Sequence, residues 1–432
     1  MYKPSFYNII IQNGLSPIVF NAVSGAIARF DNDTLLKMMD PSRCSNLPES
    51  KKMAEKGFLV STNIDEWSRL VFDRQCFIFN PSPTTIGFVI TPTLACNMKC
   101  PYCFENDGRQ LTTMNENIMF ATLAYIKKEI EDHPSVKDIS IVWFGGEPCL
   151  QSNLIVSFCD SLFPYLKVKG IGYYSRIATN GVLLTSELAH IFRDRCNITD
   201  AQITIDGLSK SYSERKRCHE SDFFQLIENI KQICDVIKVN LRVNVDSDNQ
   251  NEIPELLAFL LETNGLNGKV NLYFAQIQNW NAENGRNYLD DFSYCVFLKR
   301  IHHLILEKGW EQSFVPKRPV RQVGPCGSMR NTNATIGPDG IIYRCEHCLN
   351  LTEWAIGDVI HGKLHNEKDL MFLCKPILDK CKFCKAFPIC AGGCAANELL
   401  HGLKPVNCEN YVDIIKENVV FAVLSREKAN NT

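Results

Sequence analysis

Three cysteines stand close together in the stretch Cys96-Asn-Met-Lys-Cys100-Pro-Tyr-Cys103, which has the spacing C-x3-C-x2-C. Thiolates this close can all reach one soft metal centre, and iron–sulfur clusters are held by cysteine thiolates. Three ligands to a cluster of four irons would leave one iron open, where a small molecule could bind and accept an electron. The alternative is a zinc knot, but structural zinc takes four ligands and no fourth Cys or His stands nearby. We therefore interpret Cys96, Cys100 and Cys103 as cluster ligands.

A second motif, Gly145-Gly146-Glu147-Pro148, follows further along the chain. Two adjacent glycines let the backbone approach a ligand closely, and Glu147 supplies a carboxylate for a cation. Weaker polar candidates stand at or near the ends of later apolar runs, and each can equally be a turn residue or a strand-end group. These candidates are Asn180, Asp206, Arg242 and Asn244.

The elements that must position these residues alternate between strand and helix from Thr85 onward. The strands are expected at 86–91, 139–144, 173–178, 201–205, 239–245 and 270–275. The helices are expected at 115–131, 151–163, 187–195, 223–236 and 253–264. Near-continuous apolar strands separated by helices indicate a parallel sheet, here a partial β/α barrel of six units. Functional groups in such barrels gather at the C-terminal ends of the strands, where all of the motifs above fall.

Cysteine is unusually frequent: the chain has 20 cysteines in 432 residues, and nine of them lie between 326 and 408. Disulfides are rare in the reducing cytosol, so thiols at short spacings indicate metal ligands. The second thiol-rich region begins at Cys326 and continues with Gly340-x4-Cys345, C-x2-C-x5-C-x3-C over 381–394, and Cys408.

The C-x3-C-x2-C and Gly-Gly-Glu-Pro motifs together resemble the radical S-adenosylmethionine (SAM) superfamily. The resemblance implies that Cys96, Cys100 and Cys103 hold a 4Fe–4S cluster whose fourth iron binds SAM. It implies that Gly145, Gly146, Glu147 and Pro148 form the loop that meets the SAM ammonium group, and that Tyr102 flanks the cluster and the adenine. Contacts to the SAM ribose or carboxylate are implied for some of Asn180, Asp206, Arg242 and Asn244. One electron would then cleave SAM to methionine and a 5′-deoxyadenosyl radical, which abstracts a substrate hydrogen.

The C-terminal spacing resembles the SPASM extension of these enzymes, which holds two auxiliary 4Fe–4S clusters. Carried over, the first auxiliary cluster would use Cys326, Cys345 and Cys394, and the second Cys381, Cys384, Cys390 and Cys408. Some members place another cysteine shortly after the first one, and residues 327–333 contain none. Either Cys348 serves as the fourth ligand, or the first auxiliary cluster keeps an open iron for a substrate thiolate.

Glu346 directly follows the cysteine of Gly-x4-Cys, where sulfatase-maturing relatives carry an aspartate that acts as a base. A carboxylate there could accept the proton released as an oxidised product forms, so Glu346 is the candidate catalytic residue. The alternative is a solvated glutamate. His347 is expected at the surface or behind the site, and Cys374 and the cysteines outside these patterns are expected to pack as small apolar residues.

The composition excludes several classes of partner. The net charge is −2 without a lysine or arginine run, which gives no indication of nucleic acid binding. The N-terminus has no signal-peptide pattern, and the apolar runs are too short to span a membrane. A cytoplasmic protein is expected, with residues 85–305 as the barrel and 306–432 as the SPASM region.

Residues 1–84 are expected to form a small α+β domain ahead of the barrel. The pattern predicts a hairpin over 7–20, a third strand before residue 30, and a helix capped by Asp31. A second helix after Pro48, a short strand at 58–60, and a helix or linker over 66–79 would follow. Such a domain is compatible with a winged-helix-like module that docks a peptide leader, and equally with a structural cap on the barrel.

The sequence therefore predicts a radical SAM enzyme that modifies a ribosomally made precursor peptide by a thioether or carbon–carbon crosslink. It would carry three 4Fe–4S clusters and SAM, and would receive electrons from a flavodoxin- or ferredoxin-type donor. The first alternative is an anaerobic sulfatase-maturing enzyme that forms formylglycine. The second is no enzyme at all, but an iron–sulfur electron carrier or a zinc-binding regulator.

Overall fold

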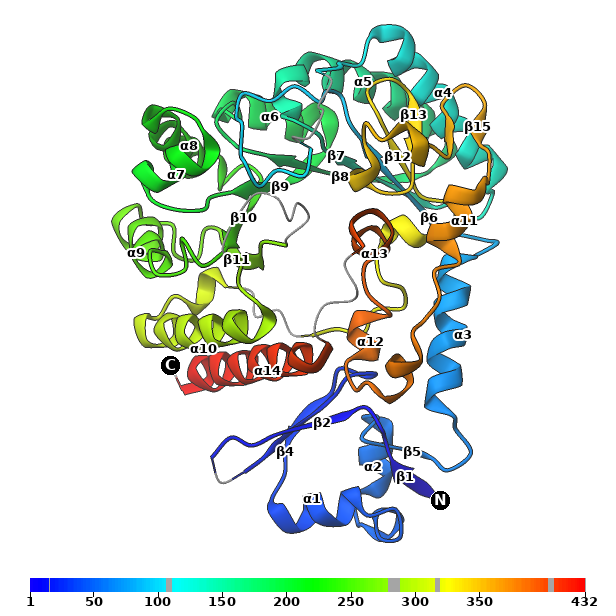
Figure 1. Cartoon of the computed structure of the whole chain (residues 1–432), viewed down its shortest axis with the longest axis vertical. Helices are drawn as coiled ribbons and strands as arrows, with labels where there is room; N and C mark the ends of the chain where they lie inside the picture. The colour runs from blue at the N-terminus through cyan, green and yellow to red at the C-terminus, as the bar shows by residue number, and fades with distance from the viewer. Residues whose placement is uncertain (15, 106–110, 279–287, 315–318, 403–407, 432) are drawn as a thin grey trace.

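The computed structural model describes residues 1–431 except 15, 106–110, 279–287, 315–318 and 403–407 (Figure 1). Its main feature is a ten-stranded sheet in the order β11-β10-β9-β8-β7-β6-β12-β13-β14-β15. The first six of these strands pair in parallel, each with its neighbour in the chain. They are β6 (Thr85–Ile90), β7 (Asp138–Trp143), β8 (Gly172–Thr179), β9 (Ile198–Thr204), β10 (Lys238–Val245) and β11 (Asn271–Gln276).

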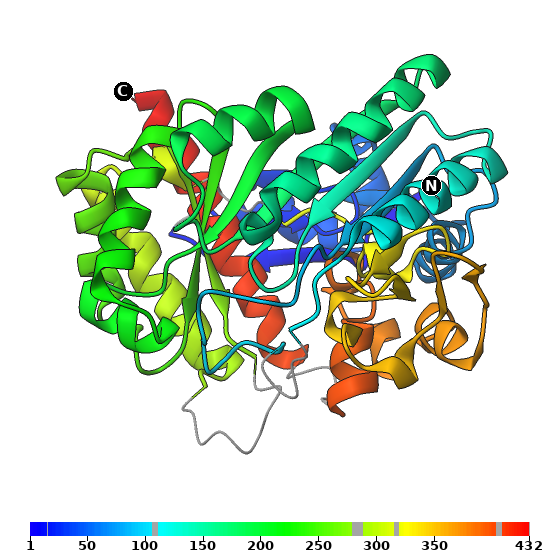
Figure 2. The ribbon, with the colours of Figure 1, turned by 90° about the horizontal axis from the view of Figure 1, so that it is seen from above.

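Helices cover the outer, convex side of this curved sheet (Figures 1 and 2). Alternate strand residues such as Ile86, Phe88 and Ile90 are buried in the apolar core that also contains residues of the helices. The partial (β/α)6 barrel is thereby confirmed. The helices are α4 (Glu116–Asp132), α5 (Ser152–Lys169), α6 (Ser186–Cys196), α7 (Ser209–Lys216), α8 (Glu220–Ile233), α9 (Ile253–Ala258) and α10 (Asp291–Lys308).

Three of these helices differ from the sequence-based expectation. Helix α5 continues through Pro164 to Lys169, because Leu166 beyond the proline is still buried. Helix α7 was not predicted, since its sequence is almost entirely polar and has no apolar periodicity. Helix α9 ends at Ala258 and continues as a π-helix, η3 (Phe259–Thr263), which is a rare local form.

The C-terminal region extends the barrel sheet instead of standing apart from it, which the sequence did not indicate. Strand β12 pairs in parallel with β6, so that Ile336 is opposite Ile90, and the remaining strands follow as antiparallel neighbours. The strands are β12 (Ala334–Ile336), β13 (Ile341–Tyr343), β14 (Gly357–Asp358) and β15 (Gly362–Lys363). The helices are α11 (Glu367–Leu373), α12 (Phe387–Cys390), α13 (Ala395–His401) and α14 (Cys408–Asn431).

Single-turn helices occur along the chain, mostly at loops that carry cysteines. They are η1 (Cys44–Asn46), η2 (Pro148–Gln151), η5 (Glu311–Ser313), η6 (Gly327–Met329), η7 (Glu346–Cys348), η8 (Thr352–Trp354) and η9 (Asp379–Phe383). None of the helices in the described part of the chain combines the length and apolar composition that a bilayer crossing needs.

The N-terminal residues form the small α+β unit that the sequence predicts. The hairpin, the third strand and the Asp31 cap are confirmed, and the segment after residue 65 is a helix that Asp65 caps. The elements are β1 (Tyr2–Pro4), β2 (Asn8–Ile11), β3 (Ile18–Asn21), β4 (Ile27–Arg29), α1 (Asn32–Met39), α2 (Ser50–Glu55), β5 (Leu59–Ser61) and α3 (Glu66–Ile78).

This unit packs against the C-terminal region, beside α12 and α14 (Figure 1). Phe20 and Tyr7 of the small sheet share one buried cluster with Phe387, Ile415 and Val419. The rings of Trp67 and Phe387 lie 4.7 Å apart. The first and last parts of the chain are therefore joined by a common apolar core.

A buried ion pair between Arg344 and Asp369 fixes the strand that leads into Cys345. Both side chains have an exposed fraction of 0%. The guanidinium also donates to the carbonyls of Arg330, Asn331 and Asn333, with distances of 2.7, 3.2 and 3.0 Å. The pair thus connects α11, β13 and the segment that precedes β12.

We expect Asp369→Asn to lower the free energy of unfolding of this region by about 3–5 kcal/mol, because it leaves a buried guanidinium without its counter-charge. Hydrogen exchange of the amides in 330–344 measures the change. Asp358→Asn is the control, since its pair with His361 is exposed and is expected to contribute less than about 1 kcal/mol. Equal protection of the two variants would show that the buried pair does not stabilise the region.

Candidate active site

A cavity of about 330 Å³ opens at the C-terminal ends of the barrel strands. It collects side chains from the loop after β6, from the strand ends and from the C-terminal region. Among its lining residues are Cys96, Cys100, Tyr102, Cys103, Phe104, Gly145, Gly146, Asn180, Gln202, Thr204, Lys216, Arg242, Asn244, Gln276, Glu346 and His347.

The three cysteines of the first motif all line this cavity, as the spacing predicts. Their loop is held by main-chain contacts: the Lys99 amide donates to the Lys216 carbonyl at 3.0 Å, and the Cys103 amide to the Cys100 carbonyl at 3.1 Å. The Met98 amide donates to the Cys96 sulfur at 3.4 Å. Amide donors directed at thiolate sulfur stabilise the deprotonated form that binds iron.

The two glycines of the second motif are required by packing against the Cys loop. A Cβ on Gly146 would lie 2.1 Å from the Ala95 carbonyl oxygen, and one on Gly145 would lie 2.5 Å from the Thr93 carbonyl oxygen. Gly145 also has a φ of 120°, which side-chain-bearing residues rarely adopt. Both glycines line the cavity, so they allow the two loops to meet at its wall.

Glu147, for which the motif predicts a contact with a ligand cation, lies buried beside the two glycines. Its side chain is fully buried and accepts from the Thr179 hydroxyl at 2.7 Å and from the Asn180 and Cys149 amides at 2.8 and 3.0 Å. Burial raises the pKa of Glu147 above its usual range, although these donors act in the opposite direction. Glu147 and the buried Pro148 therefore shape the loop from behind the cavity.

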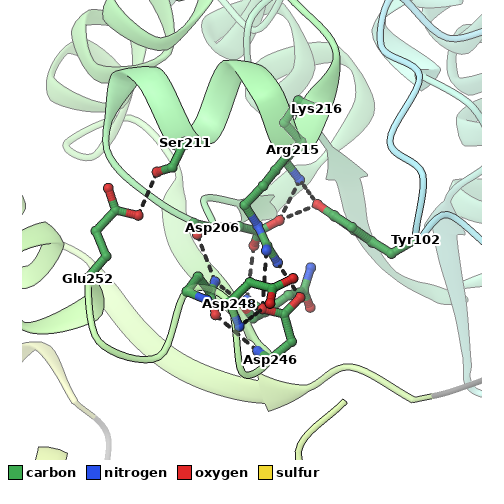
Figure 3. Close-up of polar contacts among 10 residues, drawn as sticks. Tyr102, Asp206, Ser211, Arg215, Lys216, Asp246, Asp248 and Glu252 are labelled. Carbon is green, nitrogen blue, oxygen red and sulfur yellow. Dashed lines mark hydrogen bonds and ion pairs between the residues drawn. The ribbon is translucent and has the colours of Figure 1, made fainter. Parts of the chain in front are cut away.

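A polar network ties the Cys loop to the ends of β9 and β10 (Figure 3). The Tyr102 hydroxyl donates to Asp206, and the Lys216 ammonium lies 2.5 Å from that hydroxyl and 2.9 Å from the Asp206 carboxylate. Asp206 also accepts from the Asn244 amide at 2.9 Å. Tyr102 is thus fixed at the cavity by a buried ion pair.

Both members of this ion pair stay charged. Burial alone would raise the pKa of Asp206, but Lys216 and then Arg215 hold it below its usual range. Burial alone would lower the pKa of Lys216, but Asp206 and then Cys100 hold it above its usual range. A buried cation therefore lies beside the Cys loop.

A second layer of contacts supports the network from below (Figure 3). Arg215 forms a two-pronged pair with Asp246, with distances of 3.2 and 2.9 Å. The Asn249 amide group donates to the carbonyls of Asp206 and Asn244, both at 2.8 Å. Asp206 is consequently a buried residue that supports the Cys loop. Lys216 was missed because helix α7 was not predicted.

The other predicted contact residues reach the cavity. The Asn180 side chain donates to Asn97 of the Cys loop at 2.7 Å. Arg242 donates to the Asn244 side chain at 2.8 Å, and both residues line the cavity. The sequence did not indicate the wall residues Gln202, Thr204 and Gln276, which stand within or at the ends of strands β9 and β11.

Glu346 reaches the cavity from the C-terminal region, as predicted for a catalytic carboxylate. Its neighbour His347 is part of the same wall, which corrects the expectation of a surface or peripheral residue. The His347 ring stacks on Phe104 with centroids 4.1 Å apart. Burial, and after it the charge of His401, lowers the pKa of His347 to about 4.

Four C-terminal cysteines lie together next to Glu346. Burial, followed by Glu346, Cys348 and Cys326 as neighbours, raises the pKa of the Cys345 thiol. Burial is the main cause that raises the pKa values of the Cys326 and Cys348 thiols, and the neighbouring Cys394 raises both further. Cys345 and Cys348 flank a single 3₁₀ turn, in which residues three apart share one face. Cys345 and Cys348 therefore lie on the same side of this turn.

Three cysteines of the predicted second auxiliary cluster lie near the N-terminal unit. Cys381 and Cys384 pack against the apolar core shared with Tyr7 and Phe20. Cys390 closes α12. Cys408 opens α14, but its side chain lies outside the described residues.

The donors grouped in these sites are cysteine thiols, which are the ligands that iron–sulfur clusters take. Within the described ranges, no three His, Cys, Asp or Glu side chains are placed to bind one metal ion. In a 4Fe–4S cluster each thiolate binds its own iron, so the sulfurs do not converge on one point.

The sequence was compared with family models and with curated proteins. Residues 90–260 match the model of the radical SAM superfamily. A cysteine-type anaerobic sulfatase-maturating enzyme of Clostridium perfringens is 23% identical over 344 residues, which cover 72% of this chain and 88% of that enzyme.

Solved structures share the fold. A tagged form of anSMEcpe with bound AdoMet has a TM-score of 0.62 at 18% identity, over 81% of this chain and 96% of that one. Streptococcus suis SuiB bound to the precursor peptide SuiA has a TM-score of 0.53 at 17% identity, over 93% and 97%. With the Cys loop and its cavity at the strand ends, the family match shows that residues 90–260 form a radical SAM domain.

Proposed function

We propose that the protein modifies a ribosomally made precursor peptide by radical SAM chemistry and forms a thioether or carbon–carbon crosslink. The observation that carries this proposal is that the three thiols of the Cys loop and the Glu346 carboxylate line one cavity. Hydrogen abstraction and removal of a proton are the two operations that such an oxidative bond formation needs. The three thiols of the Cys loop would serve the first operation, and the Glu346 carboxylate would serve the second.

The family implies a 4Fe–4S cluster and SAM, which when bound would supply the 5′-deoxyadenosyl radical that takes a substrate hydrogen. Cys96, Cys100 and Cys103 would hold the cluster, and the protein's own contribution is orientation and exclusion of water. The Lys216–Asp206 pair keeps Tyr102 and its loop in place. Glu346 would accept the proton that the substrate loses as the new bond forms.

The structure of the N-terminal unit is an argument for a peptide substrate. Strand β4 is an edge of its three-stranded sheet, and a groove of about 840 Å³ runs between β4 and α2. Apolar residues such as Ile27, Met53 and Phe58 line this groove. An extended peptide can add a strand to a free sheet edge and place alternate side chains in such a groove. We propose that the leader of the precursor peptide docks here.

Formation of formylglycine on a sulfatase is the second candidate. The identity to the Clostridium perfringens enzyme favours it. Two features weigh against it: Glu346 stands where those relatives carry aspartate, and the SuiB structure aligns with 93% of this chain, against 81% for anSMEcpe. We therefore rank peptide crosslinking first.

We further propose two auxiliary 4Fe–4S clusters in the C-terminal region. The oxidation would release an electron. The clusters held by cysteines between residues 326 and 408 would accept it. A flavodoxin- or ferredoxin-type donor would supply the first electron. Cys348 would complete the first auxiliary site with Cys326, Cys345 and Cys394.

The gene neighbourhood is first searched for a short open reading frame that encodes a precursor peptide. Co-expression with such a reading frame is expected to give a peptide lighter by two hydrogen atoms, as a crosslink requires. The variant with Cys96, Cys100 and Cys103 all changed to Ala is expected to yield unmodified peptide and no 5′-deoxyadenosine. Cys374→Ala is the control, because this thiol is exposed and outside the motifs. A product in which cysteine sulfur is replaced by oxygen would establish formylglycine instead. Full activity of the triple variant would contradict both candidate functions, peptide crosslinking and formylglycine formation.

Glu346→Gln is expected to reduce turnover by roughly 10²–10⁴-fold, the usual contribution of a positioned proton acceptor. Iron content and the yield of 5′-deoxyadenosine in the absence of peptide should stay at wild-type levels. Glu353→Gln provides the comparison, since Glu353 is an exposed carboxylate of the same region. Undiminished peptide turnover by Glu346→Gln would remove Glu346 from the mechanism.

Cys348→Ala is expected to leave one iron of the first auxiliary cluster without a protein ligand. An added small thiol should then change the electron paramagnetic resonance spectrum of this variant and leave that of the wild type unchanged. Cys374→Ala again serves as the control. If wild type and Cys348→Ala respond alike to the thiol, Cys348 is not a ligand.

A further inference from the structure

A buried arginine connects the N-terminal unit to the predicted second auxiliary cluster. Arg74 lies on α3, and its side chain points into the C-terminal region with only 2% of its surface exposed. An arginine stays ionised in proteins, so its burial removes a full positive charge from water. Such a charge is stable only when an opposite charge or a set of acceptors compensates it.

The contacts of Arg74 supply acceptors but no carboxylate. Its Nε donates to the Ala391 carbonyl at 3.3 Å and one Nη to the Lys375 carbonyl at 3.2 Å. Across the part of the chain that the structure describes, no Asp or Glu forms an ion pair with Arg74. Burial lowers the pKa of Arg74, and the group that opposes this effect is the Cys381 thiol.

These contacts place the guanidinium at the loop of the second auxiliary site. Ala391 directly follows Cys390 and has a left-handed backbone with φ of 51°. Its carbonyl is therefore oriented by the turn that also carries the cysteine. The nearby buried Lys375 differs from Arg74, since it pairs with Glu398 at 2.8 Å and donates to the Gly392 carbonyl at 3.0 Å. Lys385 is half-buried and donates to the Asn8 carbonyl at 2.8 Å.

We propose that Arg74 is the counter-charge of the second auxiliary cluster, so that the N-terminal unit takes part in setting the reduction potential of that cluster. This inference depends on the proposed function, because it requires a cluster on Cys381, Cys384, Cys390 and Cys408. Four thiolates outweigh the positive charge of the iron–sulfide core, and the cluster gains further negative charge on reduction. A fixed cation beside it stabilises the reduced form more than the oxidised form and raises the potential.

The shared apolar core gives this charge a fixed position. Trp67 of α3 packs on Phe387 between the cysteines, and the small sheet packs on the same surface. Arg74 is thereby a positioning residue: it acts on the cluster and touches neither the substrate nor SAM. The unit proposed to hold the leader is also the unit that supplies the counter-charge.

The test is an anaerobic redox titration of the reconstituted full-length chain with dithionite, monitored by electron paramagnetic resonance. The signal that disappears in Cys381→Ala/Cys384→Ala belongs to the second auxiliary cluster. In Arg74→Met, which keeps much of the volume and removes the charge, we expect this signal to titrate at a more negative potential. The expected change is about tenfold in the reduction equilibrium, or about 59 mV for one electron. Arg74→Lys should lie near the wild type, and Arg69→Met, on an exposed position of the same helix, should equal it.

Equal midpoints in Arg74→Met and Arg69→Met would overturn the proposal. If Arg74→Met fails to retain the cluster, iron content decides: recovery of iron in Arg74→Lys supports a role of the charge, and iron loss in both variants overturns it. Failure of the proposed function is a separate result. In that case the wild type would hold no more iron than Cys381→Ala/Cys384→Ala, and no signal would be assignable to this site.

Discussion

The parallel pairing of β12 with β6 is the constraint on which the site depends. Strand β6 carries the Cys loop at its end, and β12 lies directly beside it, with Thr335 opposite Val89. The next strand, β13, runs antiparallel to β12 and therefore begins at this edge. The turn that follows β13 brings Glu346 and His347 to the cavity wall. Without this pairing the C-terminal thiols would have no fixed position relative to the first motif.

Buried charge is the second constraint. The Lys216–Asp206 pair is almost fully removed from water, and such a pair contributes little net stability because its desolvation cost is large. The pair instead restricts the loop to a single geometry, because the two charges meet in one arrangement only. The backbone bond from Lys99 to Lys216 adds to this restriction. The loop with Cys96, Cys100 and Cys103 is thus held by polar contacts in addition to the packing of Met98 in the main core.

The sequence predicted those features that depend on short-range patterns. The alternating strands and helices, the Asp31 cap and the hairpin over residues 7–20 were all recognisable, because each has a local signal. The position of Glu346 at the cavity was expected from the resemblance to enzymes that carry an aspartate directly after the Gly-x4-Cys motif. These parts of the fold and site are encoded within a few residues of one another.

Features that depend on distant pairing could not be predicted in this way. Nothing near Ile336 indicates that β12 continues the barrel sheet, because three apolar residues fit many partners. Helix α7 has no apolar stripe, so Lys216 remained hidden, and His347 looked like a surface residue until Phe104 was found stacked on it. The burial of Glu147 and Asp206 was also not recognisable, because carboxylates that support loops and carboxylates that bind ligands have the same sequence signature.

The common core of the N-terminal unit and helices α12 and α14 has a consequence for how the molecule can be divided. Ile9, Phe20 and Leu70 cover Phe387 and Val419, so a barrel cut free of its first 80 or so residues would expose a continuous apolar face. Evolutionary exchange of this unit between enzymes would have to carry the matching surface of the cysteine-rich tail with it. The two ends of the chain form one packing unit, although the whole barrel separates them in sequence.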